Sequence, residues 1–323
     1  MPSVLFAHTM SAACTLPIAR LRLTVRAEGP VQLPPYAGSM LRGAFGHALL
    51  ALSPLPHTDG QPCALHASCP YCQLFAAPPL PGHSLQKFSA MPQPYVIEPP
   101  TGGAQQLQAG QTFDFGLVLI GKALGDLPTV LQAWQRALRT GLGRGHTPCT
   151  LIEIFDENGL QRLSDKREQL SNLNVVVPPP PALHTQATLH FHTPLRLQVQ
   201  GKPVRAGQLT ARDLLIALAR RTQLLCDVHL GAAAPKQDFA VLSTQAAAIT
   251  LHSEDLHWFD WGRYSQRQQQ EMQLGGLLGS VQLQGDLAPF AALLQLGQWL
   301  HIGKNATMGL GGYRLEAVKS SGK

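Results

Sequence analysis

A short segment near residue 65 carries side chains that can bind a metal ion. Three thiols and one imidazole recur every third residue, at Cys63, His66, Cys69 and Cys72. Cysteine and histidine are the ligands of tetrahedral zinc, and Cys-x2-Cys is a spacing found in zinc sites. Four ligands in so short a span make a cramped site, so packed free thiols and an iron–sulfur cluster stay open as alternatives. If zinc is bound, we expect a structural role.

A second chemically capable residue is His47, because an imidazole titrates near neutral pH and can take up or release a proton. The surrounding sequence predicts a helix capped by Ser39 that runs to about Leu52, with His47 nearly opposite its apolar stripe. Gly43 and Gly46 lie toward the same outer side, and each costs a helix about 1 kcal/mol relative to alanine. This cost indicates that another molecule or another part of the protein packs closely against the helix there. The alternative is that His47 is an ordinary solvated histidine.

A glycine-rich segment follows the predicted last helix, Leu287 to Leu300. Its glycines allow positive φ and carry no side chain, so backbone N–H groups can approach a phosphate, and a lysine adds charge. It lacks the Lys-Ser/Thr pair of a nucleotide-binding P-loop. A tight turn with a glycine bulge is an equally open interpretation. The candidate residues are Gly303, Lys304, Asn305, Gly309, Gly311 and Gly312.

Positive charge is concentrated in part of the chain. The 323 residues carry a net charge of +6 with only 14% charged residues, and the cations between Lys122 and His146 face a single acid, Asp126. A local basic surface is what a polyanion requires, although each cation taken alone can be an ordinary solvated charge. The candidate contacts are Arg136, Arg139, Arg144, His146, Arg263 and Arg267.

The elements that must position these residues fall into two similar halves. Each half reads strand–helix–strand–strand–helix–strand, beginning at Leu16 to Ala27 in the first and at Thr188 to Val199 in the second. This order predicts an α+β fold of tandem ferredoxin-like (RRM-like, βαββαβ) domains. The predicted domains are 1–177, with a Cys-rich insert at about 57–80, and 186–323, separated by a proline linker at 178–185.

Several classes of protein are disfavoured by composition. No segment has the length of apolar sequence that a membrane span needs, and the N-terminal stretch lacks the features of a signal peptide. Six cysteines spread over this length do not form a disulfide framework. We therefore expect a cytoplasmic globular protein with no membrane partner.

A series of glycine- and arginine-containing motifs runs in order along nearly the whole chain. The motifs are Leu41-Arg-Gly-Ala-Phe-Gly46, the Cys-Pro-Tyr-Cys insert, Gly141-Leu-Gly-Arg-Gly145, Thr193-Pro-Leu-Arg196 with Leu214 to Arg221, Arg263-Tyr-Ser-Gln-Arg267, Leu274-Gly-Gly-Leu-Leu-Gly279, Gly285-Asp-Leu, His301-Ile-Gly-Lys and Gly309-Leu-Gly-Gly-Tyr-Arg. This series resembles the CRISPR-associated repeat endoribonucleases of the RAMP superfamily, in which a C-terminal glycine-rich loop is the hallmark.

This resemblance implies recognition of a repeat stem-loop in precursor CRISPR RNA and metal-independent cleavage on its 3′ side, with a 2′,3′-cyclic phosphate and a 5′-OH as products. A non-catalytic, hairpin-binding subunit of an effector complex is the alternative, and either protein could stay bound to the mature RNA and contact other subunits. His47 is the expected acid–base residue, with RNA or the second domain as the body near its glycines. Tyr36 can orient the nucleophile or cap the core. Relatives use a lysine after the first helix; none follows here before Lys87, so Arg42 or Lys304 is the expected cation.

Overall fold

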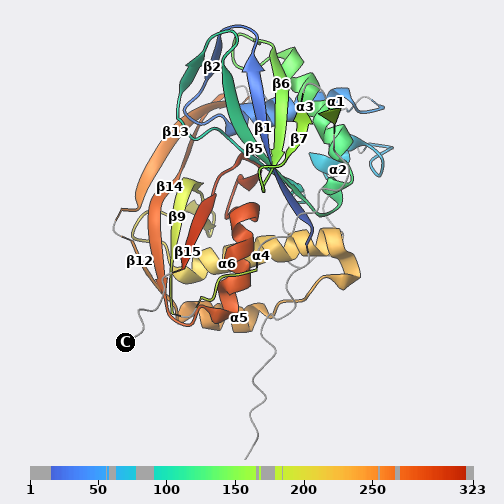
Figure 1. Ribbon diagram of the computed structural model, residues 1–323. Helices are drawn as coiled ribbons and strands as arrows, with labels where there is room; N and C mark the ends of the chain where they lie inside the picture. The colour runs from blue at the N-terminus through green and yellow to red at the C-terminus, as the bar shows by residue number, and fades with distance from the viewer. Residues whose placement is uncertain are drawn as a thin grey trace, which may run out of the picture.

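Two antiparallel sheets form the framework of the chain (Figure 1). The computed structural model describes residues 16–55, 57, 63–77, 91–164, 167–168, 179–183, 185–253, 255–265 and 270–317. Within the described residues, no helix is both long and apolar enough to cross a membrane.

The first module has the βαββαβ order that the sequence predicts. Its central strands lie in the order β3-β5-β1-β6, which is the ferredoxin-like arrangement, and β7 and β8 continue the sheet beyond β6. The elements are β1 (Ile18–Ala27), β2 (Val31–Leu33), α1 (Gly38–Ala51), α2 (Pro70–Leu74), β3 (Tyr95–Glu98), β4 (Gln105–Leu107), β5 (Thr112–Ile120), η1 (Gly121–Leu124), α3 (Leu127–Thr140), β6 (Cys149–Asp156), β7 (Gln161–Ser164) and β8 (Arg167–Glu168).

The second module repeats the same topology, with strand order β12-β14-β9-β15 and β13 paired with β14 as a long hairpin. Helix α5 was not predicted; the side chain of Asp238 accepts hydrogen bonds from two of its first N–H groups. The elements are β9 (Gln186–Leu195), β10 (Gln198–Val199), β11 (Lys202–Pro203), α4 (Ala211–Leu230), η2 (Gly231–Ala233), α5 (Phe239–Ala247), β12 (Thr250–His252), β13 (His257–Ser265), β14 (Gln270–Gln284), η3 (Ala288–Phe290), α6 (Ala291–Leu300), η4 (Ala306–Met308) and β15 (Tyr313–Ala317).

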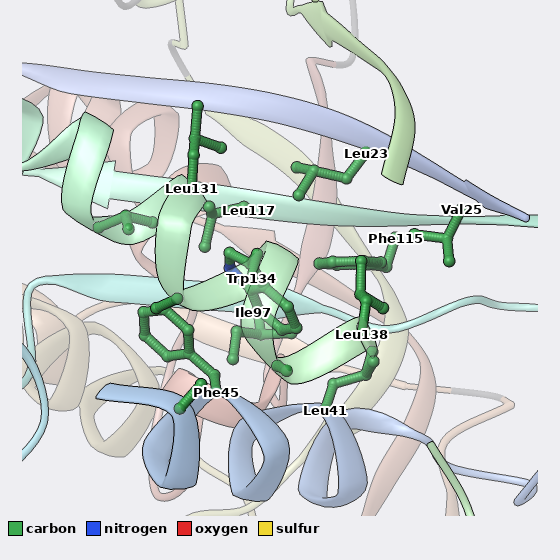
Figure 2. Close-up of a cluster of buried hydrophobic side chains, with 14 of the residues drawn as sticks. Leu23, Val25, Leu41, Phe45, Ile97, Phe115, Leu117, Leu131, Trp134 and Leu138 are labelled. Carbon is green, nitrogen blue, oxygen red and sulfur yellow. The ribbon is translucent and has the colours of Figure 1, made fainter. Parts of the chain in front are cut away.

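Apolar periodicity in the sequence explains the core of the first module. The inward residues of β1 and β5 meet the apolar stripes of α1 and α3 on one face of the sheet (Figure 2). Phe45 of α1 stacks on Trp134 of α3 with ring centroids 5.0 Å apart. The predicted cap by Ser39 is wrong, because α1 begins at Gly38 and its N-cap residue, Ala37, makes no side-chain cap bond.

The other face of the first sheet is where the two modules meet. Val96 and Val118 are fully buried against Leu296 and Trp299 of α6 and Leu225 of α4. The second module therefore covers part of a sheet face that an isolated module would expose to water. Between the modules, residues 179–183 of the predicted linker form no helix or strand, and residues 178 and 184 lie outside the described residues.

Candidate active site and nucleic-acid interface

His47 lies exposed on α1, in the orientation that the helical pattern predicts. At Gly43, one turn earlier, no described atom beyond the backbone of the helix itself lies within 4 Å of the position that a Cβ would take, so this part of the helix surface is open. Gly46 differs, because a Cβ there would collide with the ring of Phe75. The close neighbour at Gly46 is thus the residue that follows α2 in the Cys-rich insert, and not the second domain.

Tyr36 is buried at the junction of the two modules. Its hydroxyl donates a 2.6 Å hydrogen bond to the carbonyl oxygen of Met308, and its ring lies 5.0 Å from that of Trp261. Burial raises the pKa of the Tyr36 phenol well above its ordinary value, so the hydroxyl stays a donor. The Tyr36 hydroxyl therefore already donates its proton to a backbone carbonyl of the protein. This geometry favours the core-capping alternative over the expected role beside a nucleophile.

Arg42 packs within the first module. Its guanidinium lies 4.2 Å from the ring centre of Phe75, a cation–π contact. Five residues separate Arg42 from His47, which places the two about 140° apart around the helix. The structure therefore does not bring Arg42 to the open side of α1, and this geometry disfavours its expected role as the cation beside His47.

The glycine-rich segment lies between the modules. Gly309, Gly311 and Gly312 are buried, and their N–H groups donate to Ala306 O, Pro194 O and Thr193 Oγ1 at 2.8, 3.0 and 2.7 Å. These N–H groups already have acceptors within the protein, which disfavours the predicted phosphate contact. The tight-turn alternative is the one that the structure supports.

The glycines of this segment instead permit a close approach between modules. A Cβ at Gly309 would meet the carbonyl oxygen of Ile97 in β3, and one at Gly38 would meet that of Met308. The segment is thereby pressed against β3 and the start of α1. Gly303 is only partly buried, like Asn305, while Lys304 is exposed, so this end of the segment remains open to a ligand.

A polar cluster that the sequence did not reveal also joins the modules. Arg20 pairs with Glu98 at 2.9 Å and Glu157 at 3.4 Å, and Glu157 accepts a 2.9 Å bond from the indole N–H of Trp299. His301 is buried with Nε2 3.2 Å from Glu98, while its Nδ1 is 3.1 Å from the carbonyl oxygen of Gly309. Both imidazole nitrogens therefore lie beside oxygen atoms of the cluster.

Glu98 is ionised in this cluster. Burial alone raises the pKa of its carboxyl, but the hydrogen bond from His301 and the positive charge of Arg20 outweigh burial and hold the pKa below its ordinary value. Arg20 lies on the face of β1 opposite the core of the first module, where its side chain is only partly exposed. Only the second module turns that position into part of an interface.

The predicted basic surface is exposed on the first module. Arg136 and Arg139 lie on the solvent side of α3, and Arg144 and His146 are exposed in the turn that follows. A 2.6 Å hydrogen bond from Thr147 Oγ1 to the carbonyl oxygen of Pro30 anchors this turn. In the second module, Arg263 lies on β13 with its side chain not described, and Arg267 lies outside the described residues.

The cysteine insert brings a different histidine to the thiols from the one predicted. His66 is exposed and is not part of the cluster; His57 takes its place, with Nε2 3.2 Å from Cys69 Sγ. Burial raises the pKa of Cys69, but hydrogen bonds with Ser53, the Cys72 backbone and His57 lower it to about 6. For Cys72, burial and the neighbouring sulfurs raise the pKa to about 12.

Comparisons with known proteins agree with this architecture. Residues 189–313 match the family model described as the CRISPR-associated endoribonuclease Cas6, and residues 16–175 match a model described as an N-terminal domain. No curated protein matches the sequence. The chain thus shares its fold, two ferredoxin-like modules in tandem, with solved structures of Cas6 proteins. The match to the Cas6 family model covers the C-terminal module, which is less than half of the chain.

Solved structures show the same fold at low sequence identity. A Cas6 product complex has a TM-score of 0.57 at 15% identity, covering 92% of this chain and 98% of that one. Thermus thermophilus Cas6 has a TM-score of 0.55 at 13% identity, with 93% and 98% covered. A chain of a partial Cas6-RT-Cas1–Cas2 complex has a TM-score of 0.54 at 15% identity and is longer, since this chain spans 95% of its own length but 47% of that one.

Proposed function

We propose that this protein is an endoribonuclease that cleaves precursor CRISPR RNA on the 3′ side of the repeat stem-loop without a catalytic metal ion. The observation that carries the proposal is the match of residues 189–313 to the Cas6 endoribonuclease family, within a fold shared with Cas6 structures over both modules. The open face of α1 around His47 supports it, because this is an exposed acid–base group beside a glycine with free space.

The proposed reaction is a transesterification. A base removes the proton of the 2′-OH, and the 2′-oxygen attacks the adjacent phosphorus while the bond from phosphorus to the 5′-oxygen breaks. The 5′-oxygen takes up a proton, which leaves a 2′,3′-cyclic phosphate and a 5′-OH. His47 serves as the base or the acid, a role worth about 10²- to 10⁴-fold in rate. Since Arg42 is turned away, the cation for the phosphorane is expected from Lys304 or from the exposed arginines.

RNA binding is assigned to the exposed cations of the first module and to the end of the glycine-rich segment. Arg136, Arg139 and Arg144 stand on one helix and the turn after it, so they can follow successive phosphates of a stem. Replacing Arg139 with alanine should weaken binding similarly for all RNA sequences and reduce the slope of log affinity against log salt by about 1. A binding curve that does not respond to salt would contradict RNA binding itself.

The activity is tested with repeat RNA and full-length protein in single-turnover assays, first without added divalent ions and then briefly in EDTA. We expect one cut, lost when the scissile nucleotide is 2′-deoxy. His47→Ala should lower the rate at least about 10²-fold with RNA binding retained. His252→Ala is the matched control, because His252 is exposed on β12 of the other module.

The outcomes distinguish an RNA-cleaving enzyme from a subunit that binds RNA without cleaving it. Binding without cleavage in the unmodified protein would support a non-catalytic hairpin-binding subunit instead. Equal cleavage by the His47 and His252 variants would remove His47 from the mechanism. Sequencing RNA that copurifies with the protein tests whether the mature product stays bound and can carry the protein into an assembly with other subunits.

A further inference from the structure

The strongest cluster of ligand side chains outside the proposed active site lies in the insert after α1. The nearest nitrogen of His57 and the sulfurs of Cys63, Cys69 and Cys72 all lie within 4.8 Å of one another. Zinc–sulfur bonds of about 2.3 Å and zinc–nitrogen bonds of about 2.0–2.1 Å in a tetrahedron put ligand atoms about 3.5–3.8 Å apart. The four atoms therefore need to move by only about an ångström to enclose one ion.

The composition of the cluster selects the kind of ion. Thiolate and imidazole are ligands for zinc, whereas calcium and magnesium require oxygen ligands. Four protein ligands fill a tetrahedral shell and leave no position for water, which is the arrangement of structural and not catalytic zinc. Cys69 and Cys72 are buried and the three cysteines are free thiols in the structure, so they are available as ligands.

The cluster is connected to the helix that carries His47. The His57 ring lies 4.9 Å from that of Tyr71, edge to face, and Tyr71 stacks on Phe75 at 5.2 Å. Phe75 in turn covers Gly46, the residue beside His47, and lies under the Arg42 guanidinium. An ion holding His57 to the cysteines would therefore fix this aromatic stack against α1.

We propose that His57, Cys63, Cys69 and Cys72 bind one structural zinc ion that fastens the insert to the C-terminal half of α1. The geometry supports this set over the one with His66, because His57 Nε2 lies 3.2 Å from Cys69 Sγ whereas His66 is exposed and lies outside the cluster. This site does not depend on RNA cleavage.

The test measures metal on the full-length protein without RNA. Protein purified without chelator should contain about one zinc per chain by elemental analysis. After chelation, cobalt(II) should restore a stoichiometric complex with the d–d absorption of a tetrahedral site and thiolate charge-transfer bands. Zinc should then displace the cobalt and abolish both absorptions.

Two pairs of variants assign the ligands. His57→Asn should weaken cobalt binding at least about tenfold, and Cys69→Ser should lose the thiolate bands, while His66→Asn and Cys149→Ser, with Cys149 buried elsewhere in the first module, should bind as the parent does. Iron in place of zinc, absence of a cobalt complex in the unmodified protein, or equal losses in the His57 and His66 variants would overturn the proposal. Cobalt spectra of the unmodified protein decide the case even if a ligand variant does not fold.

Discussion

Tyr36→Phe distinguishes a structural from a catalytic tyrosine. The substitution removes only the hydroxyl, so the ring contact with Trp261 is kept, and the 2.6 Å bond to the Met308 carbonyl is lost. A buried hydrogen bond contributes about 0.5–1.5 kcal/mol, and an acceptor left unsatisfied raises the cost to about 1–3 kcal/mol. For 323 residues unfolding in one transition, this lowers Tm by about 1.5–4.5 °C.

Tyr313→Phe is the matched control for this experiment. Tyr313 is also buried, and its hydroxyl likewise donates a 2.6 Å bond to a backbone carbonyl, that of Leu294, but within the second module. We expect both variants to lose similar stability in calorimetry and to cleave repeat RNA at the parent's rate below their Tm. A large loss of cleavage in Tyr36→Phe alone, with unfolding unchanged, would refute the structural interpretation and return Tyr36 to the mechanism.

Three further substitutions probe the interface and α1. Glu98→Gln should lower stability by about 1–2 kcal/mol at neutral pH, because Arg20 loses its closer partner in a partly exposed cluster. The pKa of Glu98 is lower in the folded protein than in the unfolded one, so its contribution to stability is present above the unfolded pKa and is lost as pH falls through the folded pKa. The stabilities of parent and variant should therefore converge in acid, and a gap that stays constant as pH falls would contradict this. Gly311→Ala should lower the free energy of unfolding by more than about 2 kcal/mol, since Gly311 has a φ of +72° and the new Cβ would meet the Ile302 carbonyl oxygen. An unchanged Tm would contradict this arrangement of the turn. Gly43→Ala should stabilise α1 by about 1 kcal/mol because its surroundings are open, yet weaken RNA binding if RNA occupies that space; unchanged affinity would place the RNA elsewhere.

Regular elements were predictable because local periodicity encodes them. In α3 the apolar residues recur at helical spacing and bury one face of the helix. At the start of α4 the Asp213 N–H donates to Thr210 Oγ1 at 3.1 Å, the side-chain cap that a threonine favours at this position. Helix α5 escaped prediction because it is short and its apolar residues do not form a clear stripe; only its cap, Asp238, marks it.

The candidate site was predictable only where a residue's own helix decides its direction. His47 is exposed because its position opposite the apolar stripe follows from helix geometry. The glycine-rich segment has the composition of an anion loop, but its N–H groups are used by the second module's own carbonyls and hydroxyl. The glycine content indicates that backbone N–H groups can come close to an acceptor, but it does not show whether that acceptor is RNA or the protein.

The sequence by itself determined the two ferredoxin-like modules, the exposed histidine on α1 and the presence of a thiol cluster, since these depend on contacts within a few turns of chain. The tertiary structure alone decided that Tyr36 binds the glycine-rich segment, that Arg20, Glu98 and His301 meet, and that His57 joins the cysteines. Such pairs are far apart in the chain or separated by an irregular loop, so no periodicity records them. Their positions are fixed by how the buried faces of the two modules and of the insert fit together.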